Sequence, residues 1–232
     1  MSLATYTQMF RDSLSVTLKD LRIELRSKVL TMQVIPLVGA TIIIFGFALG
    51  PNLSPLKQNA AGLIWISILL CSMLAVQRSI NIEKDAGSDI LKISGFDLAG
   101  VFIGKVISVA TEIFVIGIIT IITTAVAFNT GLHGIGNILF LILIMLLSSI
   151  SLSALGIVFG AMFIVSNTAE TLLPLLYLPL ASPILLAATK ASLPTFSGNG
   201  SIKLIWIGIL FLLAVAYFSV GSISFEPLLE DF

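Results

Sequence analysis

Six long runs of apolar residues constrain this chain more than any other feature of its sequence. They cover roughly residues 29–49, 60–76, 106–128, 138–165, 172–189 and 204–224. A helix needs about 20 apolar residues to cross the hydrocarbon core of a bilayer, and most of these runs approach or exceed that length. Hydrophobic residues make up 57% of the chain and charged residues only 10%, so its polar groups are too few to cover a water-soluble globule. The sequence therefore predicts an all-α integral membrane protein with six transmembrane helices, and it excludes a soluble enzyme.

The distribution of Lys and Arg predicts the orientation of the spans. Nine of the 12 basic residues precede the first run or lie between the second run and the start of the third: Arg11, Lys19, Arg22, Arg26, Lys28, Arg78, Lys84, Lys92 and Lys105. The opposite side keeps Lys57, Lys190 and Lys203. Because basic residues gather in cytoplasmic segments, both termini are predicted to be cytoplasmic. Residues 29–224 then form the membrane domain, and 225–232 form a short acidic tail.

Residues 1–28 are predicted to form a cytoplasmic amphipathic helix ahead of the first span. Its apolar side chains share one arc at helical spacing: Phe10, Leu14, Leu18, Leu21 and Leu25. Most basic residues of the segment lie outside that arc, as in helices that lie in the membrane interface. Two interpretations stay open at this point: a helix that braces a transporter, and a general anchor on the lipid surface.

The longest polar connection, residues 78–97, is a candidate docking segment. Gly87 can end one helical stretch and Ser88 can cap the next, because its hydroxyl accepts a hydrogen bond from a free backbone N–H. Leu91 and the two isoleucines around it would give that second, short helix an apolar surface. Such a helix suits a groove in a partner protein; an ordinary solvated loop is the alternative.

Two features inside the apolar runs are candidates for function. Glu112 is an acid within the third run, and intramembrane acids mark functional sites by default; Lys105, on the same helical face, would partly balance its charge. Pro174, Pro179 and Pro183 each remove a backbone donor from the fifth run. Broken helices often line transport pathways, although a kinked structural helix is an alternative.

Small residues share one face of the fourth run: Ser149, Ser153, Gly156 and Gly160. Small residues let helix backbones approach closely in lipid. Packing within the bundle is the favoured interpretation of this face, and a homodimer seam is the alternative.

Several kinds of chemistry have no support in the sequence. A single cysteine, Cys71, and a single histidine, His133, provide neither a disulfide nor a metal cluster. A net charge of zero gives no basis for binding nucleic acid. The stretch nearest to a phosphate-binding loop, residues 99–106, lacks both its first glycine and its hydroxyl residue. We therefore expect no catalytic residues, no bound cofactor and no metal in this chain, and any ATP would be hydrolysed by another subunit.

Two stretches carry a resemblance to a known family. The second run contains GLIWISILLCSMLAVQR (62–78), and the fifth contains LLPLLYLPLASPILLA (172–187). Together with the six spans and the preceding helix, these resemble ABC-2-type permeases and, more closely, the cytochrome c biogenesis protein B (CcmB) family. The three proline positions of the fifth run coincide with those of the family.

The resemblance implies the permease subunit of an ABC complex in c-type cytochrome maturation, in the inner membrane of a bacterium or an organelle. The implied partners are a separate ATP-binding subunit, haem-handling membrane proteins and a second copy of the chain. Haem is the implied substrate, and ATP use would serve haem delivery or the release of a haem-loaded chaperone. The alternatives are a membrane scaffold without transport, and a permease for a lipid, glycan or drug.

The resemblance also implies a surface that couples to the ATP-binding subunit. It places Arg78, Glu83, Gly87 and Ser88 there, and Leu91 belongs to the same segment. The chain departs from the family pattern in this segment, because Ala86 stands where an acid is usual and Asp89-Ile90 replaces Leu-Glu. Contact with the partner is therefore expected to differ in detail.

Overall fold

The computed structural model describes residues 3–27, 30–50, 52–86, 98–129, 135–163, 169–197 and 204–230. Within these ranges the regular elements are helices and no strand is present. They are α1 (Leu3–Ser27), the π-helical turn η1 (Leu30–Val34), α2 (Ile35–Leu49), α3 (Leu53–Ala86), α5 (Leu98–Ala127), α6 (Ile135–Phe163), α7 (Ala169–Ser197) and α8 (Leu204–Glu230).

Six helical segments are long and apolar enough to cross a membrane, which confirms the predicted number of spans. They are Met32–Leu49, Ser54–Ile82, Leu98–Ala127, Gly136–Met162, Leu172–Phe196 and Leu204–Phe225. Several helices run past the apolar runs of the sequence. The clearest case is α3, whose apolar run ends near Val76 while the helix continues to Ala86. Polar residues end an apolar run, but the sequence has no proline or glycine between Val76 and Gly87 that would end the helix.

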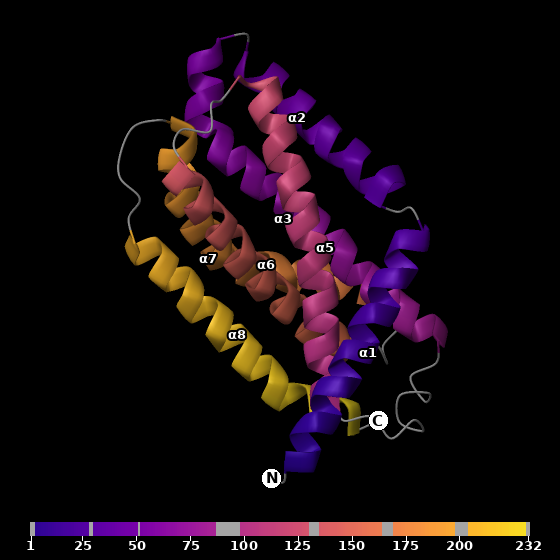
Figure 1. Ribbon diagram of the computed structural model, residues 1–232. Helices are drawn as coiled ribbons and strands as arrows, with labels where there is room; N and C mark the ends of the chain where they lie inside the picture. Colours follow the sequence, from indigo (N-terminus) through magenta and orange to yellow (C-terminus); the bar gives the residue numbers. More distant parts are fainter. Residues whose placement is uncertain are drawn as a thin grey trace.

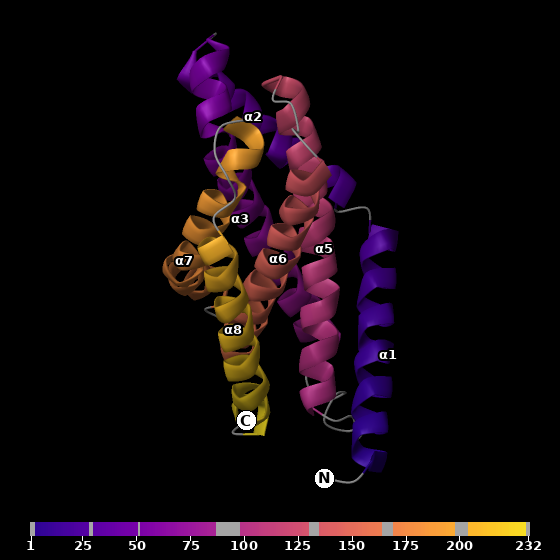
Figure 2. The same ribbon diagram turned by 60° about the vertical axis from the view of Figure 1, so that its left-hand side comes forward.

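Helix α6 occupies the middle of the bundle and contacts α3, α5, α7 and α8 (Figures 1 and 2). Helix α2 packs on α3 and α5 at one edge, and its last turn ends at Gly50, whose φ of 79° suits glycine. The end of α3 and the start of α5 lie at the same end of the bundle, called the loop end below. The start of α1 and the end of α8 also lie there (Figure 1).

Close packing in the bundle core uses the small residues of α6. A Cβ added at Gly156 would lie 2.3 Å from a side-chain carbon of Val76, and one at Gly160 would lie 2.6 Å from Ile80. Both contacts are with α3 of the same chain. The favoured interpretation, packing within the bundle, is therefore confirmed for these two glycines.

Helix α7 is continuous through Pro174, Pro179 and Pro183, so the predicted interruptions do not break it. A proline at one position frees the carbonyl four residues earlier. The carbonyl of Pro179, which Pro183 leaves without its helical donor, accepts a hydrogen bond of 2.7 Å from the hydroxyl of Ser182. This local side-chain donor explains how the helix continues past Pro183.

Candidate functional site

Helix α1 presents three different faces. The arc of Phe10, Leu14, Leu18 and Leu25 is exposed, and the basic residues beside it are exposed as well. The buried face is the small and polar one, which includes Ser13, Val16 and Thr17. In Figure 1, α1 crosses the first half of α5 and runs from lower left to upper right, whereas α3 and α8 run from upper left to lower right. The helix thus lies against the loop end of the bundle through its polar face.

Two glycines of α5 allow α1 to approach closely. A Cβ at Gly100 would lie 2.8 Å from the carbonyl oxygen of Met9, and one at Gly104 would lie 2.6 Å from that of Ser13. A Cβ at either position would clash with a backbone atom of α1, which cannot move aside as the end of a side chain can. The hydroxyl of Thr17 donates to the carbonyl of Gly104 at 3.0 Å. A Gly-x-x-x-Gly pair therefore forms the surface of α5 on which α1 packs.

Charged side chains join α1 to both α3 and α5. The guanidinium of Arg78 on α3 donates to the carboxylate of Glu24 at 2.8 Å and also bonds the hydroxyl of Ser27. Lys105 of α5 lies 3.7 Å from the carboxylate of Asp20, with only 6% of its side chain exposed. Each pair has one partner on α1 and one on a helix of the bundle. The two contacts therefore fix α1 at its second half.

Glu112 belongs to the same polar cluster. Its residue is buried, and it lines a small cavity of about 20 Å³ together with Asp20, Glu24, Arg78 and Ser108. That volume matches about one water molecule. The cluster brings together three carboxylates and two cations, counting Lys105, so Glu112 lies close to charges of both signs.

Burial outweighs the ion pair in setting the proton affinity of Glu24. Withdrawal from water raises the pKa of its carboxyl above the ordinary value of 4.5, and the charge of Arg78 and the hydrogen bond from it offset only part of that rise. The carboxylate at the centre of the contact between α1 and α3 is therefore easier to protonate than an exposed glutamate.

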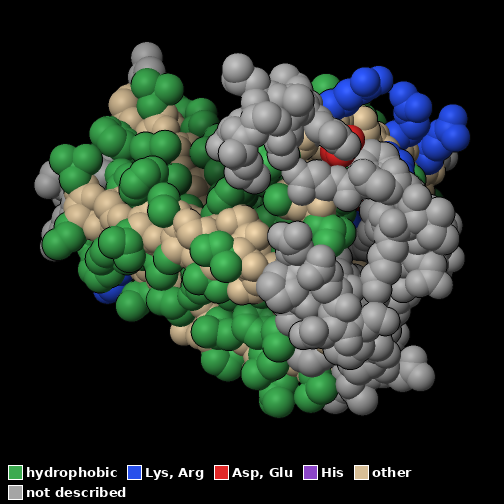
Figure 3. Space-filling model, turned by 90° about the horizontal axis from the view of Figure 1, so that it is seen from below, with side chains coloured by type: hydrophobic (Ala, Val, Ile, Leu, Met, Phe, Trp, Pro, Cys, Tyr) green, Lys and Arg blue, Asp and Glu red, His purple; other side chains and the backbone are tan. Residues whose placement is uncertain are grey.

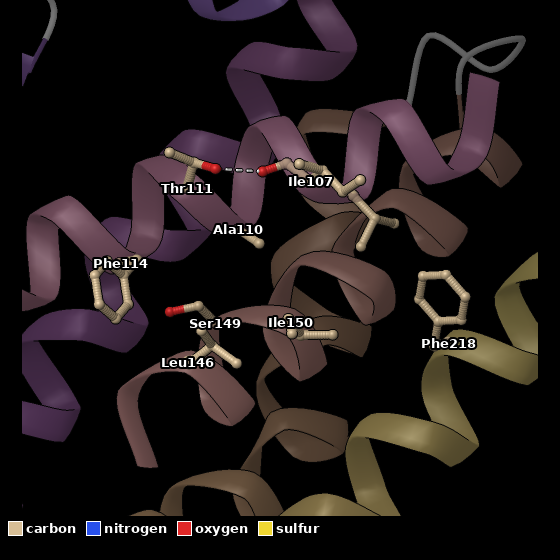
Figure 4. A pocket seen from close by; sticks show the side chains of 9 residues that line it. Ile107, Ala110, Thr111, Phe114, Leu146, Ser149, Ile150 and Phe218 are labelled. Atoms are coloured by element: carbon tan, nitrogen blue, oxygen red, sulfur yellow. Dashed lines mark hydrogen bonds between the residues drawn. The ribbon is translucent and has the colours of Figure 1, made fainter. Parts of the chain in front are cut away.

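A second hollow lies between α5, α6 and α8, with a volume of about 320 Å³. Figure 4 shows Ile107, Ala110 and Phe114 of α5 on one side, Leu146 and Ile150 of α6 on the other, and Phe218 of α8 at one end. Its two hydroxyl residues bond within their own helices: Thr111 to the carbonyl of Ile107, and Ser149 to that of Met145. The hollow offers apolar contact without directed polar groups.

The family follows from comparison with known proteins. The family model described as "CcmB protein" matches residues 11–228. The heme exporter protein B of Pseudomonas aeruginosa is 31% identical over 186 residues, which cover 78% of this chain and 81% of that protein. The chain belongs to the CcmB family. As a CcmB-family member with six spans, it is a multi-pass protein of the bacterial inner membrane.

The two segments that carry the CcmB resemblance contact each other directly. The hydroxyls of Ser72 on α3 and Tyr177 on α7 lie 2.9 Å apart, and both residues are fully buried. Two turns earlier on α3, the indole N–H of Trp65 donates to the hydroxyl of Ser192 on α7 at 2.8 Å. The second and fifth spans of this CcmB chain are thus joined by buried polar bonds.

The structure brings two of the predicted site residues together, Arg78 and Glu112. Arg78 was expected in a loop but lies on α3, and Glu83 belongs to the last turns of the same helix. Gly87, Ser88 and Leu91 lie outside the described residues, as does His133. The predicted coupling segment is therefore described only up to Ala86.

The partners on α1, Asp20 and Glu24, are site residues that the sequence analysis missed. A signal for them exists, because Ser13, Thr17, Asp20 and Glu24 recur at helical spacing, on the side of the helix opposite the basic residues. On α5, Gly100, Gly104, Ser108 and Glu112 recur every four residues. Two small and polar stripes of this kind predict a close helix pair, although neither stripe identifies its partner.

Proposed function

We propose that this chain is the membrane permease subunit of an ABC complex that exports haem for the maturation of c-type cytochromes. Membership of the CcmB family over most of the chain supports this, as does its similarity to a protein named heme exporter protein B. The energy would come from a separate ATP-binding subunit, with other haem-handling membrane proteins in the same complex. ATP hydrolysis would drive the delivery of haem, or the release of a haem-loaded chaperone from the complex.

The bond between Arg78 and Glu24 carries the mechanism that we propose. Arg78 lies eight residues before the end of α3, which is about 12 Å along a helix. The stretch from Glu83 onwards is the one that the ATP-binding subunit would contact. A displacement there would reach α1 through Arg78 and Glu24, and α5 through Asp20 and Lys105. Coupling then needs two discrete arrangements of these helices.

The role of the other predicted residues follows from this arrangement. Glu83, Gly87, Ser88 and Leu91 would form the contact with the ATP-binding subunit. Glu112 would respond to movement of the α1 pairs, because it shares their cavity. A pair of these chains would face a pair of ATP-binding subunits.

The test introduces a helix-breaking proline into the segment that contacts the partner. We expect Leu91→Pro to leave membrane insertion and ATP hydrolysis by the purified complex intact but to lower the yield of cytochrome c in cells. Leu91→Ala, which is compatible with the helix predicted there, is the matched control and should retain most of that yield. An unchanged cytochrome c yield in Leu91→Pro would contradict the coupling role of the segment.

A second experiment separates transport from a scaffold role. The tagged chain is purified in detergent, its partners are identified by mass spectrometry, and ATP hydrolysis is measured. An ATP-binding subunit in the eluate supports the permease. If cells with a catalytically inactive ATP-binding subunit still make normal amounts of cytochrome c, the chain is a scaffold.

A further inference from the structure

A cationic groove runs along the outer side of α1. Lys19, Arg22 and Arg26 are exposed and recur at helical spacing. With Ser15, Leu18 and Ile23 they line a shallow hollow of about 400 Å³. Lys and Arg side chains gather at one edge of the face shown in Figure 3.

Two of the three acids of the same helix, Asp20 and Glu24, pair with cations of the bundle, and the third, Asp12, lies beside Gly100 of α5, so the charge of this groove is largely uncompensated. Glu24 turns towards Arg78 of α3, and Asp20 towards Lys105 of α5. Lys19 lies 3.6 Å from one carboxylate oxygen of Asp20, and Lys105 of the bundle lies 3.7 Å from the other. Within the described part of the chain, Arg22 and Arg26 form no ion pair with an acid. The groove is therefore positively charged, and its ligand must carry negative charge.

An apolar stripe lies directly beside the cations. Leu14, Leu18 and Leu25 are 51%, 56% and 81% exposed. At 100° per residue these leucines and the cations occupy neighbouring sectors of the helix, while the small polar face is buried on α5. A ligand that covers both sectors has an anionic head and an apolar body.

An anionic phospholipid fits this pair of stripes better than an acidic protein surface. Helices with a leucine face and a basic face bind where headgroups meet acyl chains, and each Lys or Arg near an anionic membrane contributes to that attraction. Helix α1 is followed at once by the first span, Met32–Leu49, which places it beside the bilayer. An acidic protein surface in water would neutralise the cations but leave the leucines exposed.

We propose that Lys19, Arg22 and Arg26 of α1 bind the phosphate headgroup of an anionic membrane phospholipid, whose acyl chains lie along Leu14, Leu18 and Leu25. The site does not involve haem or ATP, and it stands independently of the transport function. Its consequence is that α1 holds lipid on one side and the polar cluster of the bundle on the other.

The test measures lipid binding by the full-length chain in detergent micelles, followed as the rise in melting temperature on titration. Phosphatidylglycerol should raise the melting temperature at lower concentration than phosphatidylcholine. The double variant Arg22→Gln/Arg26→Gln should bind phosphatidylglycerol about thirty-fold more weakly, because each charge removed costs about fivefold in affinity. Lys57→Gln/Lys190→Gln, which removes two cations elsewhere, should bind like the wild type.

Several results would overturn the proposal. One is an equal response to the two lipids, and another is an equal loss of binding in both double variants. The third is an identical rise with inorganic phosphate alone, which would show a free-anion site. Should Arg22→Gln/Arg26→Gln fail to fold, Arg22→Lys/Arg26→Lys keeps the charge and must keep the preference for phosphatidylglycerol; its loss would also overturn the proposal. If a partner subunit covers this face instead, the chain should bind that subunit in a salt-sensitive way and show no preference between the two lipids. That result would also overturn the proposal.

Discussion

The guanidinium of Arg78 and the carboxylate of Glu24 lie 2.8 Å apart although 54 positions separate them in the chain. Only 18% of the Arg78 side chain and 10% of the Glu24 side chain are exposed. A charge held in such surroundings depends on its partner, because it has lost most of its contact with water. The pair is therefore a specific link between α1 and the part of the predicted coupling segment that lies on α3.

Removing one partner of this link should destabilise the protein. Glu24→Ala leaves the largely buried Arg78 cation with Ser27 as its one hydrogen-bond partner among the described residues, and we expect a loss of about 3 kcal/mol. Arg11→Ala, an exposed change on the same helix, should cost no more than about 0.5 kcal/mol. The measurement is unfolding of the purified chain in mixed micelles. A double-mutant cycle with Arg78→Ala isolates the pair, and a coupling energy near zero would show that the contact carries no stability.

The same carboxylate predicts a pH dependence with a definite sign. Burial raises the pKa of Glu24 above 4.5, so the folded chain holds this proton more tightly than the unfolded chain. Stability from this group is present below the ordinary value and is lost as the pH rises through the raised value. Melting temperatures from about pH 4 to about pH 7 should therefore fall less steeply in Glu24→Gln than in the wild type. Parallel curves for the two proteins would contradict the shifted pKa.

The spans could be predicted from the sequence, whereas the contacts between them could not. Hydropathy is local, so six apolar runs are sufficient to place six helices. Whether Pro183 breaks α7 depends on what bonds the carbonyl that it frees, and Ser182 does so. The pairing of Arg78 with Glu24 depends on how α1 packs against the bundle, and neither residue specifies that alone. Glu112 could be recognised as unusual, but its neighbours on α1 could not.

The packing of α1 against α5 should be disturbed by a single added methyl group on α5. In Gly104→Ala the added Cβ would lie 2.6 Å from the carbonyl oxygen of Ser13, so α1 must shift, at a cost of about 1–3 kcal/mol. Gly208→Ala on α8 is the matched control, because a Cβ there meets nothing within 4 Å. Proteolysis of α1 in the purified chain should accelerate in the first variant and stay at the wild-type rate in the second. Equal rates in the two variants would mean that α1 does not rest on Gly104.

The buried bond between the second and fifth spans should be measurable as well. Tyr177→Phe removes a hydroxyl that lies 2.9 Å from Ser72 and also donates to the carbonyl of Leu152 at 3.4 Å. Hydrogen bonds between membrane helices contribute about 1 kcal/mol, and the ring itself keeps its packing. We expect that loss in unfolding experiments, and a smaller one for Tyr217→Phe, because the Tyr217 hydroxyl makes one such bond, to the carbonyl of Leu180, where that of Tyr177 makes two contacts. If Tyr177→Phe costs no more than Tyr217→Phe, the polar contact between α3 and α7 adds nothing to the packing of these two helices.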